Sequence, residues 1–245
     1  MLGDDGGVFA FGRAPFLGSV PGLGVDTTAT HLALTPDQRG YWVLGADGGV
    51  FSFGDAHYEG SVPAIGAHTA AVSLVPTPSG LGYWVLGRDG SVFSFGDAPR
   101  LALSSGTRVI GRAVDLVATR SGRGYWVLDA QGRVTSVGDA RPHGSLPTSG
   151  IEARAVSMAA TSSGNGYWVL GSDGGVFSFG DARYHGSVPG QCASAQGVGL
   201  VATSTGSGYY VLAGDGRVFG FGDAPAYGDP SALHVATTSV AADHG

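Results

Sequence analysis

Short runs of aromatic and β-branched residues recur along the chain, separated by turns rich in glycine, aspartate and serine. Tyr41-Trp42-Val43-Leu44 and Val50-Phe51-Ser52-Phe53 show the pattern. Both runs are short and have high β propensity, which predicts strands rather than helices. Residues 45–49 between them contain Asp-Gly, a pair favoured where the backbone needs positive φ, so we expect a hairpin. A third strand is expected ahead of each pair, at 72–75 in one copy.

These runs repeat at a constant spacing. The string that begins at Gly40 recurs every 42 residues, with Tyr210 in place of tryptophan in its last copy. The string that begins at Asp47 has six copies on the same period. A period of about 40 residues is typical of a propeller blade of four strands. After the hairpin, residues 60–63 are expected to supply a short outer strand that ends at a proline.

Both faces of the predicted sheets are apolar. Side chains alternate along a strand, so Trp42 and Leu44 share one face while Tyr41 and Val43 share the other. A sheet that is apolar on both faces needs a neighbour on each side, and a ring of blades provides one. We therefore predict that residues 1–245 form a single domain, an all-β six-bladed β-propeller.

The two ends of the chain together supply the sixth blade. On the repeat register, residues 239–242 align with a first strand and Met1-Leu2 aligns with Val43-Leu44. Pairing between the ends would close the ring and remove exposed sheet edges. The alternative is a longer native chain that continues past Gly245 and closes with seven blades.

Composition and charge narrow the classes of partner. All 13 basic residues are arginines, scattered singly from Arg13 to Arg217, so we expect no nucleic acid partner. Cys192 is the only cysteine, which excludes an intramolecular disulfide and a two-cysteine metal site. We treat its position, in the connection 190–197, as incidental. No apolar run approaches the roughly 18 residues that span a bilayer, so we expect no membrane insertion.

Motifs of catalysis and cofactor binding are missing from the sequence. It has no Gly-x-Ser-x-Gly elbow, no His-Glu-x-x-His and no Walker loop. The seven histidines are dispersed. We therefore expect no enzyme activity, no cofactor and no metal.

The repeat resembles one found in secreted and surface-associated actinobacterial proteins. Gly-Tyr-Trp-Val-Leu-Gly followed by Asp-Gly-Gly-Val-Phe-Ser-Phe-Gly-Asp-Ala carries the resemblance, which covers nearly the whole chain. Such repeats sometimes accompany cell-wall hydrolase or peptidase domains. The resemblance implies an extracellular or cell-surface accessory role, with the native signal sequence not present in this chain.

A second, more distant similarity is to the regulator-of-chromosome-condensation repeat. Residues 215–222 followed by Gly228 carry it, and bacterial β-lactamase-inhibitor propellers share that pattern. Those repeats are longer, usually form seven blades, and have a tryptophan where this chain has Phe53. Relatives of this kind present loops to a protein partner, a mode that requires no catalytic group.

Two sets of residues recur once per repeat. The aspartates that follow a glycine at the end of the hairpin could form a ring of calcium ligands or general acids. We favour a structural role, accepting backbone N–H bonds in the next turn, because Arg13 stands at the equivalent place in the first copy. The tryptophans could stack on sugars, but their apolar neighbours favour the core. The aspartates are Asp55, Asp97, Asp139, Asp181 and Asp223, and the tryptophans are Trp42, Trp84, Trp126 and Trp168.

Candidate binding residues lie where the repeat varies, in the three positions after each Gly-Asp-Ala. Tyrosine, histidine and arginine are enriched there, and these side chains stack on and hydrogen-bond to ligands at moderate entropic cost. An ordinary solvated blade edge is the alternative for any one of them. The candidates are His57, Tyr58, Arg100, Arg141, His143, Arg183, Tyr184, His185 and Tyr227.

Three functional hypotheses follow. The first is a non-catalytic extracellular propeller that binds a cell-envelope glycan or polysaccharide through repeated, individually weak loop sites, with avidity from repetition. The second is a protein-interaction or inhibitor propeller. The third is a hydrolase or lyase with an axial active site, which three or more converging titratable side chains in a deep axial pocket would favour.

Overall fold

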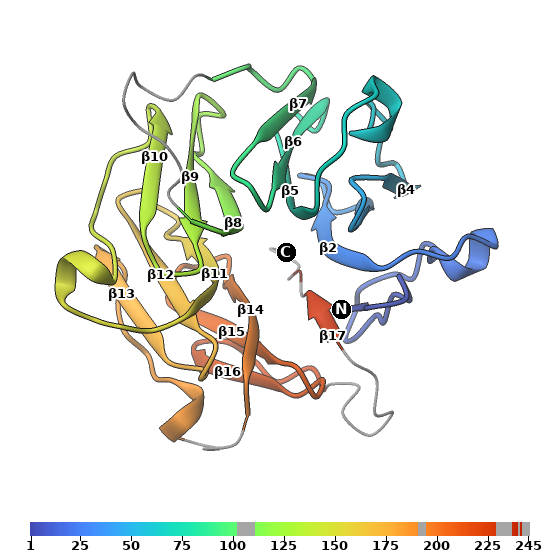
Figure 1. Ribbon diagram of the computed structural model, residues 1–245. Helices are drawn as coiled ribbons and strands as arrows, with labels where there is room; N and C mark the ends of the chain where they lie inside the picture. The colour runs from blue at the N-terminus through green and yellow to red at the C-terminus, as the bar shows by residue number, and fades with distance from the viewer. Residues whose placement is uncertain (102–110, 191–194, 229–236, 240, 242–245) are drawn as a thin grey trace.

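The structure, a computed structural model, consists of sheets arranged around a common axis. It describes residues 1–101, 111–190, 195–228, 237–239 and 241. Within these residues there are five three-stranded antiparallel sheets and one two-stranded sheet (Figure 1). The predicted all-β six-bladed propeller is confirmed. The five full blades are β2 (Ala29–Leu34), β3 (Gly40–Gly45) and β4 (Val50–Gly54); β5 (Ala71–Pro76), β6 (Gly82–Gly87) and β7 (Val92–Gly96); β8 (Ala113–Ala118), β9 (Gly124–Asp129) and β10 (Val134–Gly138); β11 (Ala155–Ala160), β12 (Gly166–Gly171) and β13 (Val176–Gly180); and β14 (Gly197–Ala202), β15 (Gly208–Ala213) and β16 (Val218–Gly222).

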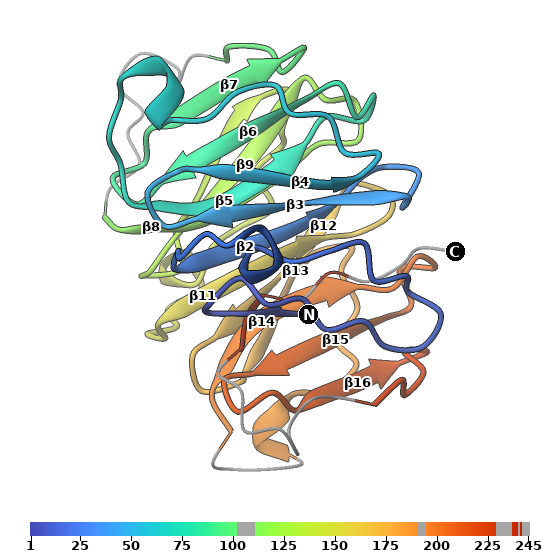
Figure 2. The same cartoon turned by 90° about the vertical axis from the view of Figure 1, so that its right-hand side faces the viewer.

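Every full blade is a meander whose first strand lies nearest the axis (Figure 1). Figure 2 shows the strands from the side, running across the thickness of the ring. Because successive strands are antiparallel, the connections between first and second strands gather on one face of the ring, the loop face. The hairpins between second and third strands gather on the other, the hairpin face. In the first blade these are residues 35–39 and 46–49.

The expected fourth strand is absent from the described blades, and this prediction was wrong. Residues 60–63 cross to the next blade instead, with Gly60 at a φ of 132° and its α-carbon against the Phe95 ring. The Tyr83 hydroxyl donates a hydrogen bond to the Gly60 carbonyl. The segment then enters a short 3-10 helix. Four such helices are described, η1 (Pro21–Leu23), η2 (Pro63–Ile65), η3 (Pro147–Ser149) and η4 (Val188–Gly190).

The hydrophobic core lies between blades rather than within one. Trp42 and Leu44 share a buried cluster with Tyr83 and Val85 of the next blade. The Trp42 and Tyr83 rings lie 5.7 Å apart. The tryptophan face of one sheet therefore packs against the tyrosine face of its neighbour, which confirms the prediction that neither face meets water.

Each tryptophan also fixes the segment that follows its own hairpin. The Trp42 indole Nε1 donates to the backbone carbonyl of His57 at 2.8 Å, and Trp168 bonds to Arg183 at 2.7 Å. Trp84 and Trp126 make the same bond to Pro99 and Arg141. All four tryptophans are at most 1% exposed. Their predicted place in the core is confirmed.

The split blade also forms as predicted. Strand β1 (Leu2–Gly3) pairs antiparallel with β17 (Thr237–Ser239), which lies between β14 and β2 (Figure 1). Leu2 pairs with Ser239, whereas strict 42-residue spacing would pair it with residue 241. Side chains on a strand alternate with period two, so a two-residue shift keeps the same face toward the axis. Residues 240 and 242 of the predicted strand lie outside the described residues.

Removing one interlocking tryptophan should show how much this packing contributes. We expect Trp168→Ala to lower the free energy of unfolding by about 3–5 kcal/mol, because it leaves a large cavity between two blades. Trp168→Phe keeps most of the volume but loses the indole donor, so its cost should be about 1–2 kcal/mol. Urea denaturation with linear extrapolation measures both. Equal losses for the two variants would contradict an origin in packing.

Candidate functional site

The variable loop residues lie on the outer edge of the ring, and most of them are exposed. Tyr58 and Tyr184 occupy the same position of the repeat and are 54% and 60% exposed. Each hydroxyl is 3.1 Å from a serine hydroxyl three residues on, Ser61 or Ser187. Phe16, at the equivalent position of the first copy, is 60% exposed. At this position three copies therefore present an aromatic ring to solvent, and in two of them a hydrogen bond fixes the ring.

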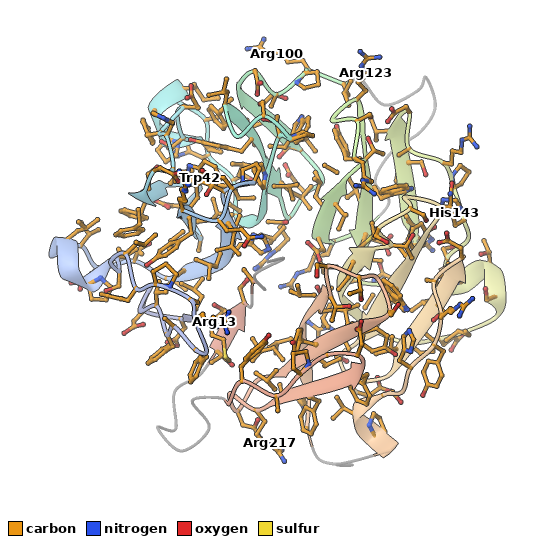
Figure 3. All side chains as sticks on the ribbon, turned by 180° about the vertical axis from the view of Figure 1, so that it is seen from behind. Arg13, Trp42, Arg100, Arg123, His143 and Arg217 are labelled. Atoms are coloured by element: carbon orange, nitrogen blue, oxygen red, sulfur yellow. The ribbon has the colours of Figure 1, made fainter. Side chains whose placement is uncertain are left out.

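The other exposed candidates surround these rings. His57, Arg141 and Arg183 are exposed, and the carbonyl of each accepts the tryptophan bond of its own blade. Figure 3 shows the Arg100 side chain pointing away from the ring at its outer edge. Tyr227 is exposed, and its ring centre lies 6.4 Å from that of Tyr210, which stands in the tryptophan position of the fifth blade.

His143 and His185 differ from the rest because both pack inward. His143 meets the Tyr167 ring edge-on at 5.6 Å, and His185 meets Tyr209 at 5.7 Å. Their backbone N–H groups donate to the same tyrosine hydroxyls. Neither Nε2 atom has a hydrogen-bond partner within the described residues. The geometry thus places these two imidazoles between blades, while their part in binding stays a prediction.

The recurring aspartates brace the loop face. Asp97 accepts hydrogen bonds from the hydroxyls of Thr77 at 2.8 Å and Ser79 at 2.5 Å, which ties the first-to-second-strand loop to the end of the third strand. Asp139, Asp181 and Asp223 accept the corresponding pairs in their own blades. A structural role is confirmed, but these donors are hydroxyls of the first-to-second-strand loop, whereas the prediction named backbone N–H groups of the following turn. No group of three or more metal-ligating side chains occurs in the described part of the chain.

A ring of polar side chains around the axis was missed by the sequence analysis. Its members occupy one position of the innermost strands and are His31, Ser73, Asp115, Ser157 and Ser239. Strand β14 has Gly199 at this position and contributes no side chain. His31 Nδ1 accepts the N–H of Leu74 at 3.3 Å, and Ser157 Oγ accepts that of Leu200 at 3.3 Å. These bonds join neighbouring blades next to an axial cavity of about 460 Å³.

Asp115 is the most heavily bonded member of this ring. Its carboxylate accepts hydrogen bonds from the Ser73 and Ser157 hydroxyls at 3.1 and 3.0 Å and from the N–H groups of Leu116 and Met158, both at 2.9 Å. Burial raises the pKa of Asp115, although His31 and the hydrogen bonds from Met158, Ser157 and Leu116 act against the rise. Burial lowers the pKa of His31. The sequence did contain a signal for this site, because Asp115 is a polar residue between apolar neighbours in a predicted strand.

The residues that line the axial cavity test the hypothesis of a hydrolase or lyase with an axial active site. The described lining contains two titratable side chains, His31 and Asp115, among hydroxyl and aliphatic groups. The four donors to Asp115 already occupy its oxygens. The three converging titratable groups that would favour a hydrolase or lyase do not occur among the described lining residues.

Arginines that are dispersed in the sequence gather on the hairpin face, which the sequence analysis also missed. Arg112 and Arg154 line one cavity together with Arg133. Arg112 and Arg133 belong to the third full blade and Arg154 to the fourth, and each was counted as a single charge. No pattern within one repeat could have placed Arg154 beside the other two.

Two serines of the fourth full blade offer a matched test of the axial ring. Ser157 bridges two blades through Asp115 and Leu200. The Ser178 hydroxyl is buried without a hydrogen-bond partner within the described residues. Ser157→Ala should lower the free energy of unfolding by about 2 kcal/mol or more, whereas Ser178→Ala should be neutral or stabilising. Urea midpoints measure both, and a neutral Ser157→Ala would count against the ring.

The bracing aspartates predict acid sensitivity. Hydrogen bonds from Ser163 first, and also from Thr161, hold the pKa of Asp181 below its usual value. A carboxyl whose folded pKa is depressed stabilises the fold above its unfolded pKa of about 4, and this contribution is lost as pH falls through the folded pKa. Asp181→Asn should therefore be less stable than the native chain at pH 6, with a gap in urea midpoint that closes toward about pH 2. Ser163→Ala should narrow the same gap, and a gap independent of pH would contradict the assignment.

Comparison with known proteins supports the fold. No family model and no curated protein matches the chain. No helix within the described residues is long and apolar enough to cross a membrane. A solved structure, the β-propeller domain of Cps50 (Swd1) from Myceliophteria thermophila, is similar with a TM-score of 0.55 at 10% identity, over 80% of this chain and 70% of that chain. At this identity the similarity concerns architecture alone, and by its architecture the chain is a β-propeller.

Proposed function

We propose that this chain is a non-catalytic binding propeller that recognises a cell-envelope glycan or polysaccharide through aromatic residues repeated on its outer edge. The observation that carries the proposal is the pair Tyr58 and Tyr184, each more than half exposed yet held by a hydrogen bond to a serine hydroxyl. An exposed aromatic ring is costly to hydrate, and a fixed one offers a flat apolar platform to the C–H face of a sugar. Fixing the ring in advance lowers the entropy lost on binding.

The loops behind these rings are also fixed. The His57 carbonyl accepts the Trp42 indole bond, and the backbone N–H of Glu59 donates to the Tyr83 hydroxyl at 3.1 Å. Tyr58 therefore projects from a segment anchored on both sides. His57 and Arg183, exposed beside the two rings, can donate hydrogen bonds to sugar hydroxyls.

Repetition of a weak binding site can raise the overall affinity for a polymer. Phe16 and Tyr58 lie on neighbouring blades, and Tyr184 lies three repeats from Tyr58. A soluble monosaccharide can occupy one such site at a time, whereas a polymer network can occupy several. Linked binding events raise the overall affinity without new contacts. An extracellular location fits this role and remains part of the proposal.

A protein partner is the second candidate, favoured by a different observation. Leu23 and Ile65 sit at the same position of η1 and η2 on neighbouring blades and are 57% and 60% exposed. Exposed aliphatic side chains of this kind occur at protein interfaces. They also provide a control for the aromatic sites.

Co-sedimentation with insoluble peptidoglycan and with an insoluble neutral polysaccharide tests the proposal. We expect the native chain to be retained on at least one of them, and Tyr58→Ala/Tyr184→Ala to reduce the bound fraction by about fivefold or more. Leu23→Ala/Ile65→Ala should bind like the native chain. Circular dichroism melts confirm that each variant is folded.

Two results would overturn the glycan proposal. One is a native chain that stays entirely in the supernatant with both polymers. The other is an equal loss of retention in the aromatic and aliphatic variants. Loss in the aliphatic variant alone would likewise contradict the assignment of binding to Tyr58 and Tyr184.

A further inference from the structure

Two arginines occupy equivalent places on neighbouring blades at the hairpin face. Arg112 directly precedes β8, and Arg154 directly precedes β11. The backbone between them is continuous in hydrogen bonds, because Ala130 N–H donates to the Arg112 carbonyl at 2.8 Å and Ala155 N–H donates to the Ala130 carbonyl at 3.1 Å. Both side chains are exposed at the ends of innermost strands. Two positive charges thus lie on adjoining blades.

A third arginine joins them from the β6–β7 hairpin. The backbone N–H of Ala113, next to Arg112, donates to the Arg88 carbonyl at 2.9 Å. Partial burial, followed by the positive charges of Arg88 and Arg154, lowers the pKa of Arg112. Like charges on adjoining segments repel one another, and an anion placed among them relieves the repulsion.

A cavity lies beside these side chains. It has a volume of about 830 Å³ and is bounded by the β9–β10 hairpin and by the segment around η3. Arg112, Arg133 and Arg154 line it. Arg133 is 3.4 Å from the Asp129 carboxylate, whereas no described carboxylate lies within ion-pair distance of Arg112 or Arg154.

The remaining walls limit the type of ligand. Pro147 and Ile151 contribute apolar surface, Gln131 contributes an amide, and Glu152 contributes the one acidic side chain. A single carboxylate opposite two arginines leaves the cavity with an excess of positive charge. The Glu152 carboxylate also disfavours a ligand whose negative charges fill the whole cavity, because it would repel them.

We propose that this cavity binds a small multivalent oxyanion, with Arg112 and Arg154 as its principal contacts. A guanidinium presents N–H donors in a planar fork that matches two oxygens of a phosphate or carboxylate. Two such forks on adjoining blades suit a ligand with two or more oxyanion groups. Phosphate and carboxylate ligands share this chemistry and are distinguished by experiment.

The site is separate from the proposed glycan platforms. Those lie on the loops that follow the third strand of each blade, and the arginines lie where the innermost strands begin. Either proposal can fail without the other. A substitution at Arg112 should leave retention on insoluble polysaccharide unchanged.

Isothermal titration calorimetry at low ionic strength, with tripolyphosphate and with citrate as probes, tests the proposal. We expect at least one probe to bind the native chain, and Arg112→Gln/Arg154→Gln to weaken that binding by about tenfold or more. The matched control is Arg39→Gln/Arg123→Gln, which removes the same charge from exposed positions of the loop face. The control should change the affinity by less than about twofold.

The outcomes separate a site from general charge attraction. Binding lost in the cavity variant and kept in the control supports the proposal, and the preferred probe identifies the ligand as phosphate-type or carboxylate-type. An equal loss in both variants, or no binding of either probe to the native chain, overturns it. Thermal melts of both variants, whose substituted side chains are all exposed, verify folding.

Discussion

The packing of one blade's tryptophan face against the next blade's tyrosine face is the interaction on which the rest of the structure depends. Trp42 meets Tyr83, and the pattern continues around the ring as Trp84 with Tyr125, Trp126 with Tyr167 and Trp168 with Tyr209. Each middle strand is buried on both faces and has no stable place outside the ring. A single blade therefore contributes little alone, and closure is what completes the burial of every sheet.

The polar ends of these aromatic residues organise the loops. Each indole N–H holds the segment after its own hairpin, and the Tyr83, Tyr167 and Tyr209 hydroxyls hold the segment arriving from the previous blade. The loops that vary between copies are thus supported by core residues that recur in most copies. This separation of a recurring core from variable connections allows an exposed tyrosine to be held in place, as the proposed binding role requires.

Several positions differ between copies, so the blades of the ring are not chemically equivalent. Around the axis, the residues at equivalent positions range from His31 through Asp115 to Ser239, so the junctions between blades are not all alike, and one buried carboxylate accepts four hydrogen bonds. On the hairpin face, Arg112 and Arg154 replace the uncharged residues found at the same place in other copies. Both features break the approximate six-fold symmetry, and both lie away from the aromatic core.

The sequence by itself predicted six blades in these residues, with seven in a longer chain as the alternative, and it determined the hairpins, the core tryptophans and the pairing of the two ends. The physical reason is that a strict 42-residue spacing of aromatic residues permits few arrangements that bury both sheet faces. The sequence also located the exposed tyrosines as variable loop residues. Only the tertiary structure decided that 60–63 cross between blades, that Leu2 pairs with Ser239, and that His143 and His185 pack inward. The axial ring and the arginine cavity likewise join residues from different repeats. Such contacts depend on how neighbouring blades dock, and a pattern read along one strand carries no information about the side chain that the next blade brings to it.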